Sequence, residues 1–232
     1  MRNKSFDIAA YLRTFKMPGA PQHTRVERVT IDGYKYSRFV NEFWTARQRQ
    51  ASSLHEVSYR ACFKPQLPRF FIELLTEPGN VVYDPFSGRG TTILEAGLLG
   101  RNVIANDINP LSQILSAPRF FVPTIDDLTQ RLETIPLVRK VKSSIDLSMF
   151  YHPDTLKEIV SLREYLLARH ASGRVDDLDA WIRMAATNRL TGHSSGFFSV
   201  YTLPPNQAVS ASSQKKINVK LEQAPPYRDT RA

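Results

Sequence analysis

The chain has 232 residues, of which 42% are apolar, so it can bury a core and is not a disordered polypeptide. Its 31 Lys and Arg side chains outnumber its 22 Asp and Glu side chains, and the formal net charge of +9 favours a polyanionic partner. One cysteine excludes a disulfide framework and a cysteine-built zinc site, and no apolar run reaches the roughly 18 residues of a membrane span. We expect a cytoplasmic protein with no membrane partner and no metal site.

The positive charge is unevenly divided along the chain. Residues 1–80 carry 13 basic and 7 acidic side chains, residues 81–150 carry 7 of each, and residues 151–232 carry 11 and 8. Because the middle is neutral, a bound nucleic acid is expected to meet the two flanks. Scattered Lys and Arg that only keep the surface soluble would give the same counts.

The first 54 residues are predicted to form a basic arm followed by a helix. Several Pro and Gly residues interrupt residues 1–35, which are expected to be extended apart from a short helix near 8–15. Apolar residues at helical spacing predict an amphipathic helix over 36–50. Its apolar face would carry Phe39, Val40, Phe43 and Trp44. We interpret these side chains as core packing, with base stacking as the alternative.

Helices and strands are predicted to alternate in residues 55–150. A helix is expected over 66–76, an apolar strand over 81–83, a helix over 91–99 and a second strand over 103–106. A strand, a helix and a strand in this order form a βαβ unit, so the strands should be parallel and buried on both faces. The fold class is therefore predicted to be α/β.

The remaining residues are predicted to be mostly helical. Thr155 and Glu158 have capping-box spacing, and Asp176 is expected to cap another helix. Residues 196–201 resemble a strand, and the polar, Pro-rich stretch from Pro204 is expected to be an exposed tail. The expected organisation is an arm over 1–54, a βαβ module over 55–150, a helical segment over 151–203 and a tail over 204–232.

The segment Asp84-Pro-Phe-Ser-Gly-Arg-Gly-Thr-Thr92 joins the first strand of this unit to its helix. Ligands bind open α/β sheets at such loops. Gly88 and Gly90 permit positive φ and close backbone approach, and the helix that follows presents free N–H groups to an anion. Asp107 ends the next strand, where a carboxylate can bind a ribose diol. The pattern predicts a nucleoside ligand that carries an anionic group.

Two other nucleotide motifs fit this loop poorly. A nicotinamide dinucleotide fingerprint needs G-x-G-x-x-G, but Ile93 stands at the third glycine position, and no G-x-x-x-x-G-K-[ST] run occurs. Asp84 would also repel a pyrophosphate, whereas it suits a cationic ligand. S-adenosylmethionine has an ammonium group, a sulfonium group and a ribose diol.

The loop resembles the cofactor motif of DNA methyltransferases that act on exocyclic amines, which has the form D-P-F-x-G-x-G-T-T. Phe63-Lys64-Pro65-Gln-Leu-Pro resembles the motif that precedes it in these enzymes, and Asn106-Asp-Ile-Asn-Pro110 resembles their second acidic motif. The resemblance covers roughly residues 55–115. It implies a Rossmann-like methyltransferase fold, S-adenosylmethionine as cofactor, and transfer of its methyl group to cytosine or adenine in duplex DNA.

This resemblance also implies a set of cofactor-binding residues. Asp107 would hold the ribose, Ile108 would lie against the adenine, and Asp84 would meet the ammonium group. Packing alone is the alternative for Thr92 and Ile108, and a surface role is the alternative for Lys64. Arg89 is expected to be a surface residue. The set consists of Phe63, Lys64, Pro65, Asp84, Pro85, Phe86, Ser87, Gly88, Gly90, Thr91, Thr92, Asp107 and Ile108.

These enzymes also need an Asp/Asn/Ser-Pro-Pro-Tyr/Phe loop, because an exocyclic amine is a poor nucleophile until an acceptor takes its proton. Pro225, Pro226 and Tyr227 offer the aromatic ring, but Ala224 stands at the acceptor position, so a Pro-rich turn is the competing interpretation. We expect an incomplete sheet in this chain and a catalytic loop on a missing C-terminal part or a second polypeptide. The alternatives are an RNA guanine amino-methyltransferase and a non-catalytic subunit that binds DNA or cofactor.

Overall fold

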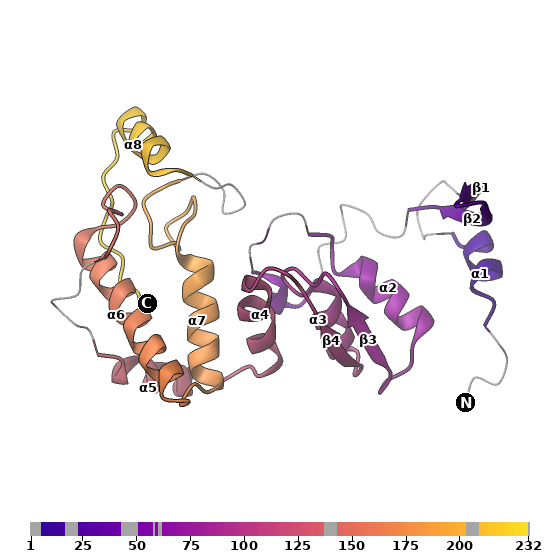
Figure 1. Ribbon diagram of the computed structural model, residues 1–232, viewed down its shortest axis with the longest axis horizontal. Coiled ribbons are helices and arrows are strands. Elements are labelled where there is room, and N and C mark those ends of the chain that lie inside the picture. The colour runs from indigo at the N-terminus through magenta and orange to yellow at the C-terminus, as the bar shows by residue number, and fades with distance from the viewer. Residues whose placement is uncertain are drawn as a thin grey trace.

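The computed structural model describes residues 6–16, 23–42, 51–57, 59, 62–136, 143–202 and 209–231. Figure 1 shows an elongated molecule with a β-hairpin and a short helix at one end, a small parallel sheet with its helices in the middle, and a group of helices at the other end. No helix among the described residues has the length and apolar character needed to cross a membrane.

The N-terminal end contains α1 (Ile8–Thr14) and the antiparallel hairpin of β1 (Arg25–Ile31) and β2 (Tyr34–Val40). The short helix near residues 8–15 is confirmed. The helix predicted over 36–50 is wrong for residues 36–40, which are strand, and Phe43 and Trp44 lie outside the described residues. Asp32 and Gly33 both have positive φ, as a two-residue hairpin turn requires, and this turn outweighs the helical spacing that follows it.

Aromatic packing joins α1 to the middle of the molecule. The ring of Phe15 lies 5.0 Å from that of Phe70, which belongs to α2 (Gln66–Leu75). The hairpin is anchored to the end of α1, because Asn41 Nδ2 donates to the Phe15 carbonyl at 3.0 Å and to Thr24 Oγ1 at 2.7 Å. The hairpin is therefore connected to α2 through packed side chains as well as through the chain.

The βαβ unit is confirmed. Strand β3 (Val81–Asp84) pairs in parallel with β4 (Asn102–Ala105), and α3 (Thr91–Leu98) connects them and contacts both. The single turn η1 (Ser53–His55) precedes α2, while α4 (Leu111–Ser116) and the short turn η2 (Ala117–Phe120) follow β4. The register pairs Asp84 with Ala105, so both strands end at the same edge.

The expectation that this sheet is buried on both faces is wrong. Val82 and Val103 are half-buried, whereas Tyr83 and Ile104, which pair on the opposite face, are 58% and 54% exposed. Helices that cross between further strands cover the second face of a parallel sheet, and the described residues contain only these two parallel strands. The strand predicted over 196–201 does not form. Phe197 and Phe198 there are buried in irregular backbone.

The other end of the molecule contains α5 (Ile125–Thr134), α6 (Pro153–Ala171), α7 (Asp177–Arg189) and α8 (Ala211–Lys220). Asp176 caps α7 as predicted. The cap of α6 is His152, so the capping role predicted for Thr155 is wrong. The exposed tail is also wrong for residues 209–231. Gln214 in α8 is fully buried, and the chain after α8 runs along α6 (Figure 1).

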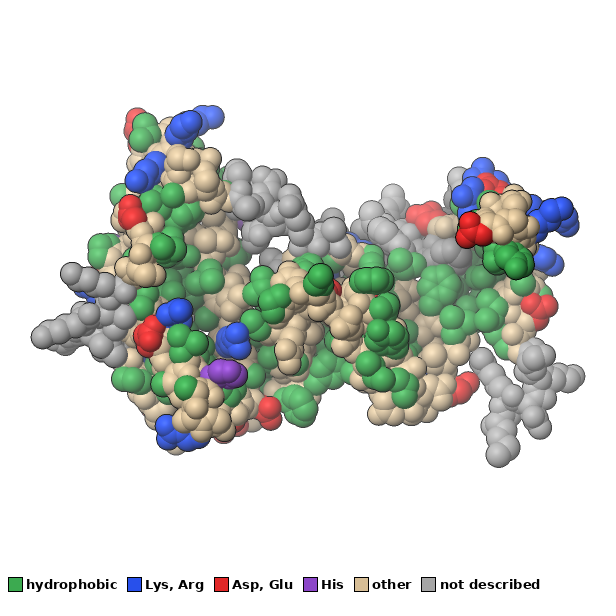
Figure 2. Space-filling model, in the orientation of Figure 1, with side chains coloured by type: hydrophobic (Ala, Val, Ile, Leu, Met, Phe, Trp, Pro, Cys, Tyr) green, Lys and Arg blue, Asp and Glu red, His purple; other side chains and the backbone are tan. Residues whose placement is uncertain are grey.

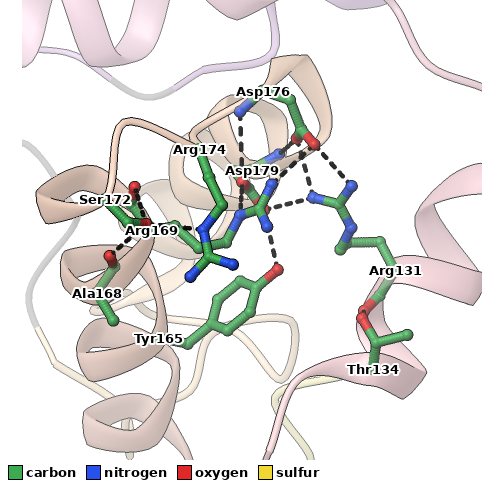
Figure 3. Close-up of polar contacts among 9 residues, drawn as sticks. All are labelled: Arg131, Thr134, Tyr165, Ala168, Arg169, Ser172, Arg174, Asp176 and Asp179. Carbon is green, nitrogen blue, oxygen red and sulfur yellow. Dashed lines mark hydrogen bonds and ion pairs between the residues drawn. The ribbon is translucent and has the colours of Figure 1, made fainter.

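A buried polar cluster connects α5, α6 and α7 (Figure 3). Asp179 has no solvent exposure and accepts hydrogen bonds from Arg131 at 2.6 Å, from Tyr165 at 3.2 Å and from Arg169. Asp176 accepts from both guanidinium groups, at 2.7 Å from Arg131 and 3.0 Å from Arg169. A charge without solvent needs such partners. The cluster therefore fixes the relative positions of three helices.

Two apolar clusters complete the core. Met149, Phe150, Tyr151 and Phe198 pack within the helical end. Val57, Leu115 and Met184 form the second cluster, which joins the segment before α2 to α4 and α7. The second cluster therefore connects the sheet region to the helices.

Candidate functional site

The loop from Asp84 to Gly90 leaves β3 and folds against the end of β4. The Ser87 N–H donates to the Asn106 carbonyl at 2.9 Å, and the Gly90 N–H donates to the Ser87 carbonyl at 2.6 Å. The Asp84 carboxylate accepts from the Phe86 N–H at 3.0 Å. These bonds hold the loop in a compact turn at the carboxyl edge of the sheet, where open α/β sheets bind their ligands.

The carboxylate of Asp107 reaches this loop from the end of β4. It accepts the Asn109 N–H at 2.8 Å and the Gly88 N–H at 2.7 Å, and these two bonds hold the pKa of Asp107 below its usual range. The group is therefore ionised at neutral pH. An ionised carboxylate has about four acceptor positions, so two remain open for ligand hydroxyls. The structure thus brings the Asp107 carboxylate against the glycine loop.

Both loop glycines are required by their surroundings. Gly88 and Gly90 have φ of +51° and +84°, in the left-handed region. A Cβ at Gly90 would lie 2.8 Å from the Cβ of Ser116, and one at Gly88 would lie 3.3 Å from the ring of Tyr59. Tyr59 also accepts a hydrogen bond from Asn109 Nδ2 at 3.2 Å. Sequence reasoning missed Tyr59, which no motif distinguishes.

Several predicted residues support the loop from within. The buried Ser87 hydroxyl lies 2.9 Å from the Ser112 hydroxyl of α4 and donates to the Asn106 carbonyl at 3.2 Å. Thr91 is buried, and its hydroxyl accepts from Arg89 Nε at 3.2 Å. Thr92 and Pro85 are half-buried. The Thr91 hydroxyl thus helps to hold Arg89 within the loop.

Other predicted residues are open to solvent. Phe86 is 86% exposed and Ile108 is fully exposed, although both are apolar and flank the carboxyl edge of the sheet. Phe63 and Lys64 are exposed just before α2, and Pro65 is buried as the residue that precedes its first turn. Exposed apolar side chains beside a carboxylate are suited to pack against the flat ring of a ligand.

Arg89 is not the surface residue that the sequence predicted. Its guanidinium donates to the carbonyls of His55 at 3.0 Å and Val57 at 2.9 Å. Arg119, 3% exposed, donates in turn to the Arg89 carbonyl, to Leu115 O at 2.7 Å and to Leu54 O at 2.8 Å. Burial, together with the charge of Arg89, lowers the pKa of Arg119 to about 10, so it stays protonated at neutral pH.

A buried contact between a histidine and a carboxylate lies beside α3. His55 Nε2 and Glu95 Oε1 are 2.7 Å apart, both side chains are buried, and Arg69 reaches Glu95 at 3.4 Å. The pair connects η1 to α3. Sequence reasoning missed both residues, because they lie 40 positions apart and neither belongs to a motif.

A cleft of about 570 Å³ opens beside Asp107, between β4 and α4. Its polar wall includes Ser87, Asn106 and Asp107, and its apolar wall includes Ile93 and Val103. Ligand sites of small molecules have roughly 300–1,000 Å³ and combine an apolar wall with a few polar groups. The cleft therefore has the size and composition of a ligand site next to the predicted ribose-binding carboxylate.

The structure does not bring Pro225, Pro226 and Tyr227 to this site. The Tyr227 hydroxyl donates to Glu158 of α6 at 2.8 Å, and this bond raises the pKa of Tyr227 to about 12. The next residues continue along the same helix, with Arg228 N–H donating to Thr155 and Thr230 N–H to Glu158. The segment thus covers α6, at the end of the molecule away from β3.

Comparison with known proteins agrees with the geometry of the loop. Residues 14–114 match a family described as DNA methylase, N6_N4_Mtase. The chain is 36% identical over 112 residues to the type II methyltransferase M.BsoBI of Geobacillus stearothermophilus, which covers 44% of this chain and 21% of that protein. It is 44% identical over 61 residues to M.MvaI of Kocuria varians, covering 25% of this chain and 13% of that protein.

A tRNA (guanine(10)-N2)-dimethyltransferase of Methanocaldococcus jannaschii is 35% identical over 63 residues, covering 27% of this chain and 18% of that protein. The matched segments thus span about a fifth or less of these relatives. No solved structure shows a significant match. Over residues 14–114, the chain is similar to the N6/N4 DNA methylase family.

Proposed function

We propose that this chain binds S-adenosylmethionine at the Asp84–Gly90 loop, as part of an enzyme that methylates an exocyclic amine of cytosine or adenine in duplex DNA. The observation that carries the proposal is the meeting of two left-handed glycines and the Asp107 carboxylate at the carboxyl edge of parallel strands. The family match over residues 14–114 supports the choice of methyl donor.

The residues of the loop fit this cofactor. Asp107 keeps two acceptor positions for a ribose diol, and Ile108 offers an exposed apolar surface to the adenine. Asp84 supplies negative charge for the ammonium group. The carboxylate of the cofactor would meet the N–H groups at the start of α3. The bound cofactor supplies an electrophilic methyl group.

We further propose that the catalytic loop is contributed by another part of the enzyme, such as a second polypeptide. The exposed face of β3 and β4, with Tyr83 and Ile104, is the face that crossover helices cover in parallel sheets. Tyr227 is held on α6 by Glu158, so it supplies no ring to the Asp107 site. We therefore expect no methyl transfer by this chain alone.

Calorimetric titration with S-adenosylhomocysteine tests the cofactor site. Wild-type protein should bind, and Asp107→Ala should weaken binding at least about tenfold, because a lost charged hydrogen-bond acceptor costs about 1.5–3 kcal/mol. Asp126→Ala removes an exposed carboxylate from the first turn of α5 and is the matched control. Unchanged affinity in Asp107→Ala, with folding confirmed by circular dichroism, would refute the ribose assignment.

An RNA substrate is the second candidate, because the similar segment of a tRNA (guanine(10)-N2)-dimethyltransferase covers 27% of the chain. Binding of labelled duplex DNA and of transfer RNA should be compared at equal ionic strength. Preference for duplex DNA supports the first proposal, and preference for transfer RNA supports the second. Methyl incorporation should be measured in the same samples, and robust turnover by the chain alone would contradict the need for another catalytic part.

A further inference from the structure

The hairpin of β1 and β2 has no role in the cofactor site. It is a ribbon of seven cross-strand pairs, and Figure 1 shows it at the end of the molecule opposite α5–α8. Most of its side chains are exposed on both faces, including Ile31, Tyr34 and Tyr36 near the turn. A two-stranded ribbon is marginally stable on its own, so its contacts with the end of α1 contribute to its order.

The cross-strand register separates two faces with different charge. One face carries the neighbouring pairs Arg28–Ser37 and Thr30–Lys35, that is, two cations and two hydroxyls without a carboxylate. On the other face, Glu27 lies 2.7 Å from Arg25 and accepts hydrogen bonds from Arg38. The hydrogen bond from Arg38 lowers the pKa of Glu27, so this carboxylate balances part of the charge of both arginines.

Arg28 and Lys35 therefore differ from the other cations of the ribbon. Both are exposed, and among the described residues neither forms an ion pair. Figure 2 shows Lys and Arg side chains gathered at this end of the molecule. The ribbon also lies in the part of the sequence, residues 1–80, that carries 13 basic and 7 acidic side chains.

We propose that the face formed by Arg28, Thr30, Lys35 and Ser37 contacts the phosphate backbone of duplex DNA. The choice of DNA rests on the proposed function. Cations and hydroxyls make most protein contacts with DNA phosphates, and the major groove admits a two-stranded ribbon. The anchoring of Asn41 on Phe15, and of Phe15 on Phe70, connects the ribbon to the βαβ unit. DNA held by the ribbon is thereby restrained relative to the cofactor site.

The salt dependence of DNA binding tests this face directly. Affinity for a fluorescent duplex should be measured by anisotropy between about 50 and about 300 mM salt for the full chain and for Arg28→Gln combined with Lys35→Gln. Each lost phosphate contact should reduce the slope of log K against log salt by about 0.9, so the double variant should lose about 1.8. Its affinity should fall about equally for unrelated DNA sequences.

Arg25→Gln is the matched control, because it removes the same charge from the opposite face, where Arg38 still pairs with Glu27. Its slope should change by less than that of Arg28→Gln alone. Equal slopes for the control and Arg28→Gln, an unchanged slope in the double variant, or no duplex binding by wild-type protein would each overturn the proposal. S-adenosylhomocysteine binding in the same preparation separates this failure from failure of the cofactor site.

Tyr34→Ala tests the opposite face of the ribbon, which carries Tyr34 and the charge-balanced Glu27. We expect this variant to keep the wild-type slope and most of the affinity, since Tyr34 lies on the face opposite Arg28 and Lys35. Loss of DNA affinity in Tyr34→Ala, with none in the double variant, would assign the contact to the opposite face and overturn the proposal. Circular dichroism of each variant checks that the hairpin and the helices remain folded.

Discussion

The sheet region and the helical end use buried charge in different ways. Around the loop, Arg119 and Arg89 direct their guanidinium groups at backbone carbonyls, and Asp107 accepts backbone N–H groups. Between the helices, Asp179 and its arginine partners bind one another (Figure 3). The first arrangement fixes the path of a loop, whereas the second fixes the packing of regular elements.

This difference has a physical reason. A loop without a helical or sheet ladder must find other partners for its backbone groups, and charged side chains supply several at once. Helices satisfy their own backbone, so charged side chains between them are free to form closed pairs. Breaking the first network should therefore damage both stability and cofactor binding. Breaking the second should damage stability alone.

Arg119→Ala should have the largest effect. It removes the guanidinium donor from the carbonyls of Leu115, Leu54 and Arg89 at a side chain only 3% exposed, which we expect to cost about 3–5 kcal/mol. Urea unfolding measures the loss. Arg174→Ala is the control, because the exposed Arg174 side chain donates to Ser172 alone among the described residues, so its effect should stay within about 0.5 kcal/mol.

The same Arg119→Ala protein should bind S-adenosylhomocysteine more weakly even where it remains folded, since the Arg89 carbonyl belongs to the loop that we propose as the cofactor site. Calorimetry below the unfolding transition measures this second effect. A destabilised variant with unchanged cofactor affinity would show that the network supports the fold but not the loop, and the proposed difference between the two regions would disappear.

Asp179→Asn should destabilise the protein by about 3 kcal/mol, because Arg131 and Arg169 lose their buried carboxylate partner and keep only Asp176. Cofactor affinity of the folded protein should remain at the wild-type value. Asp177→Asn removes an exposed carboxylate from the same helical turn and controls for the change in helix charge. A fall in cofactor affinity in Asp179→Asn would mean that the helical end and the loop are energetically coupled.

Gly90→Ala should cost about 2–3 kcal/mol. Part of the cost is the left-handed backbone, about 1–2 kcal/mol, and the rest is the clash of the new Cβ with Ser116 at 2.8 Å. Gly79→Ala is a close control, since Gly79 has the same φ of +84° with nothing within 4 Å of its Cβ position. The difference in unfolding free energy between the two variants therefore measures the clash. Equal losses would mean that Ser116 and α4 move aside freely.

The parts of the site that sequence predicts are those whose signal is local. Apolar runs mark β3 and β4, and the spacing of Gly88 and Gly90 marks the loop between strand and helix. Arg119 has no such signal, because the Leu54 carbonyl that it binds lies 65 residues earlier. Contacts at this separation depend on the packed structure, which a single sequence does not display.

Two segments are predicted wrongly although the sequence contains the local signal for the correct structure. Asp32-Gly33 is a strong hairpin turn, yet the apolar residues that follow it also match a helical period. The polarity of the stretch from Pro204 predicts an exposed tail, but the Ser210 hydroxyl accepts the Ser213 N–H and caps α8. In both places a specific turn or cap decided the local structure, and average polarity or periodicity did not.

The smallest predicted effect depends on pH. Hydrogen bonding from Arg131, in a cluster that also contains Arg169, lowers the pKa of Asp176 to about 2. Because the folded pKa is depressed, this group stabilises the protein above the unfolded pKa of about 3.9, and the contribution is lost as pH falls toward 2. Asp176 is 41% exposed, so solvent screening limits the contribution to about 1 kcal/mol.

Comparing wild-type protein with Asp176→Asn measures this contribution, through the urea midpoint at several pH values from about 5 to about 2. The midpoints should differ most at the upper end and converge at the lower end, and high salt should reduce the difference at pH 5 because the group is partly exposed. A difference that stays constant with pH would mean that Asp176 acts only as the hydrogen-bonding cap of α7. The charge of the helical cluster would then rest on Asp179 alone, which makes Asp179→Asn the sharper probe of that region.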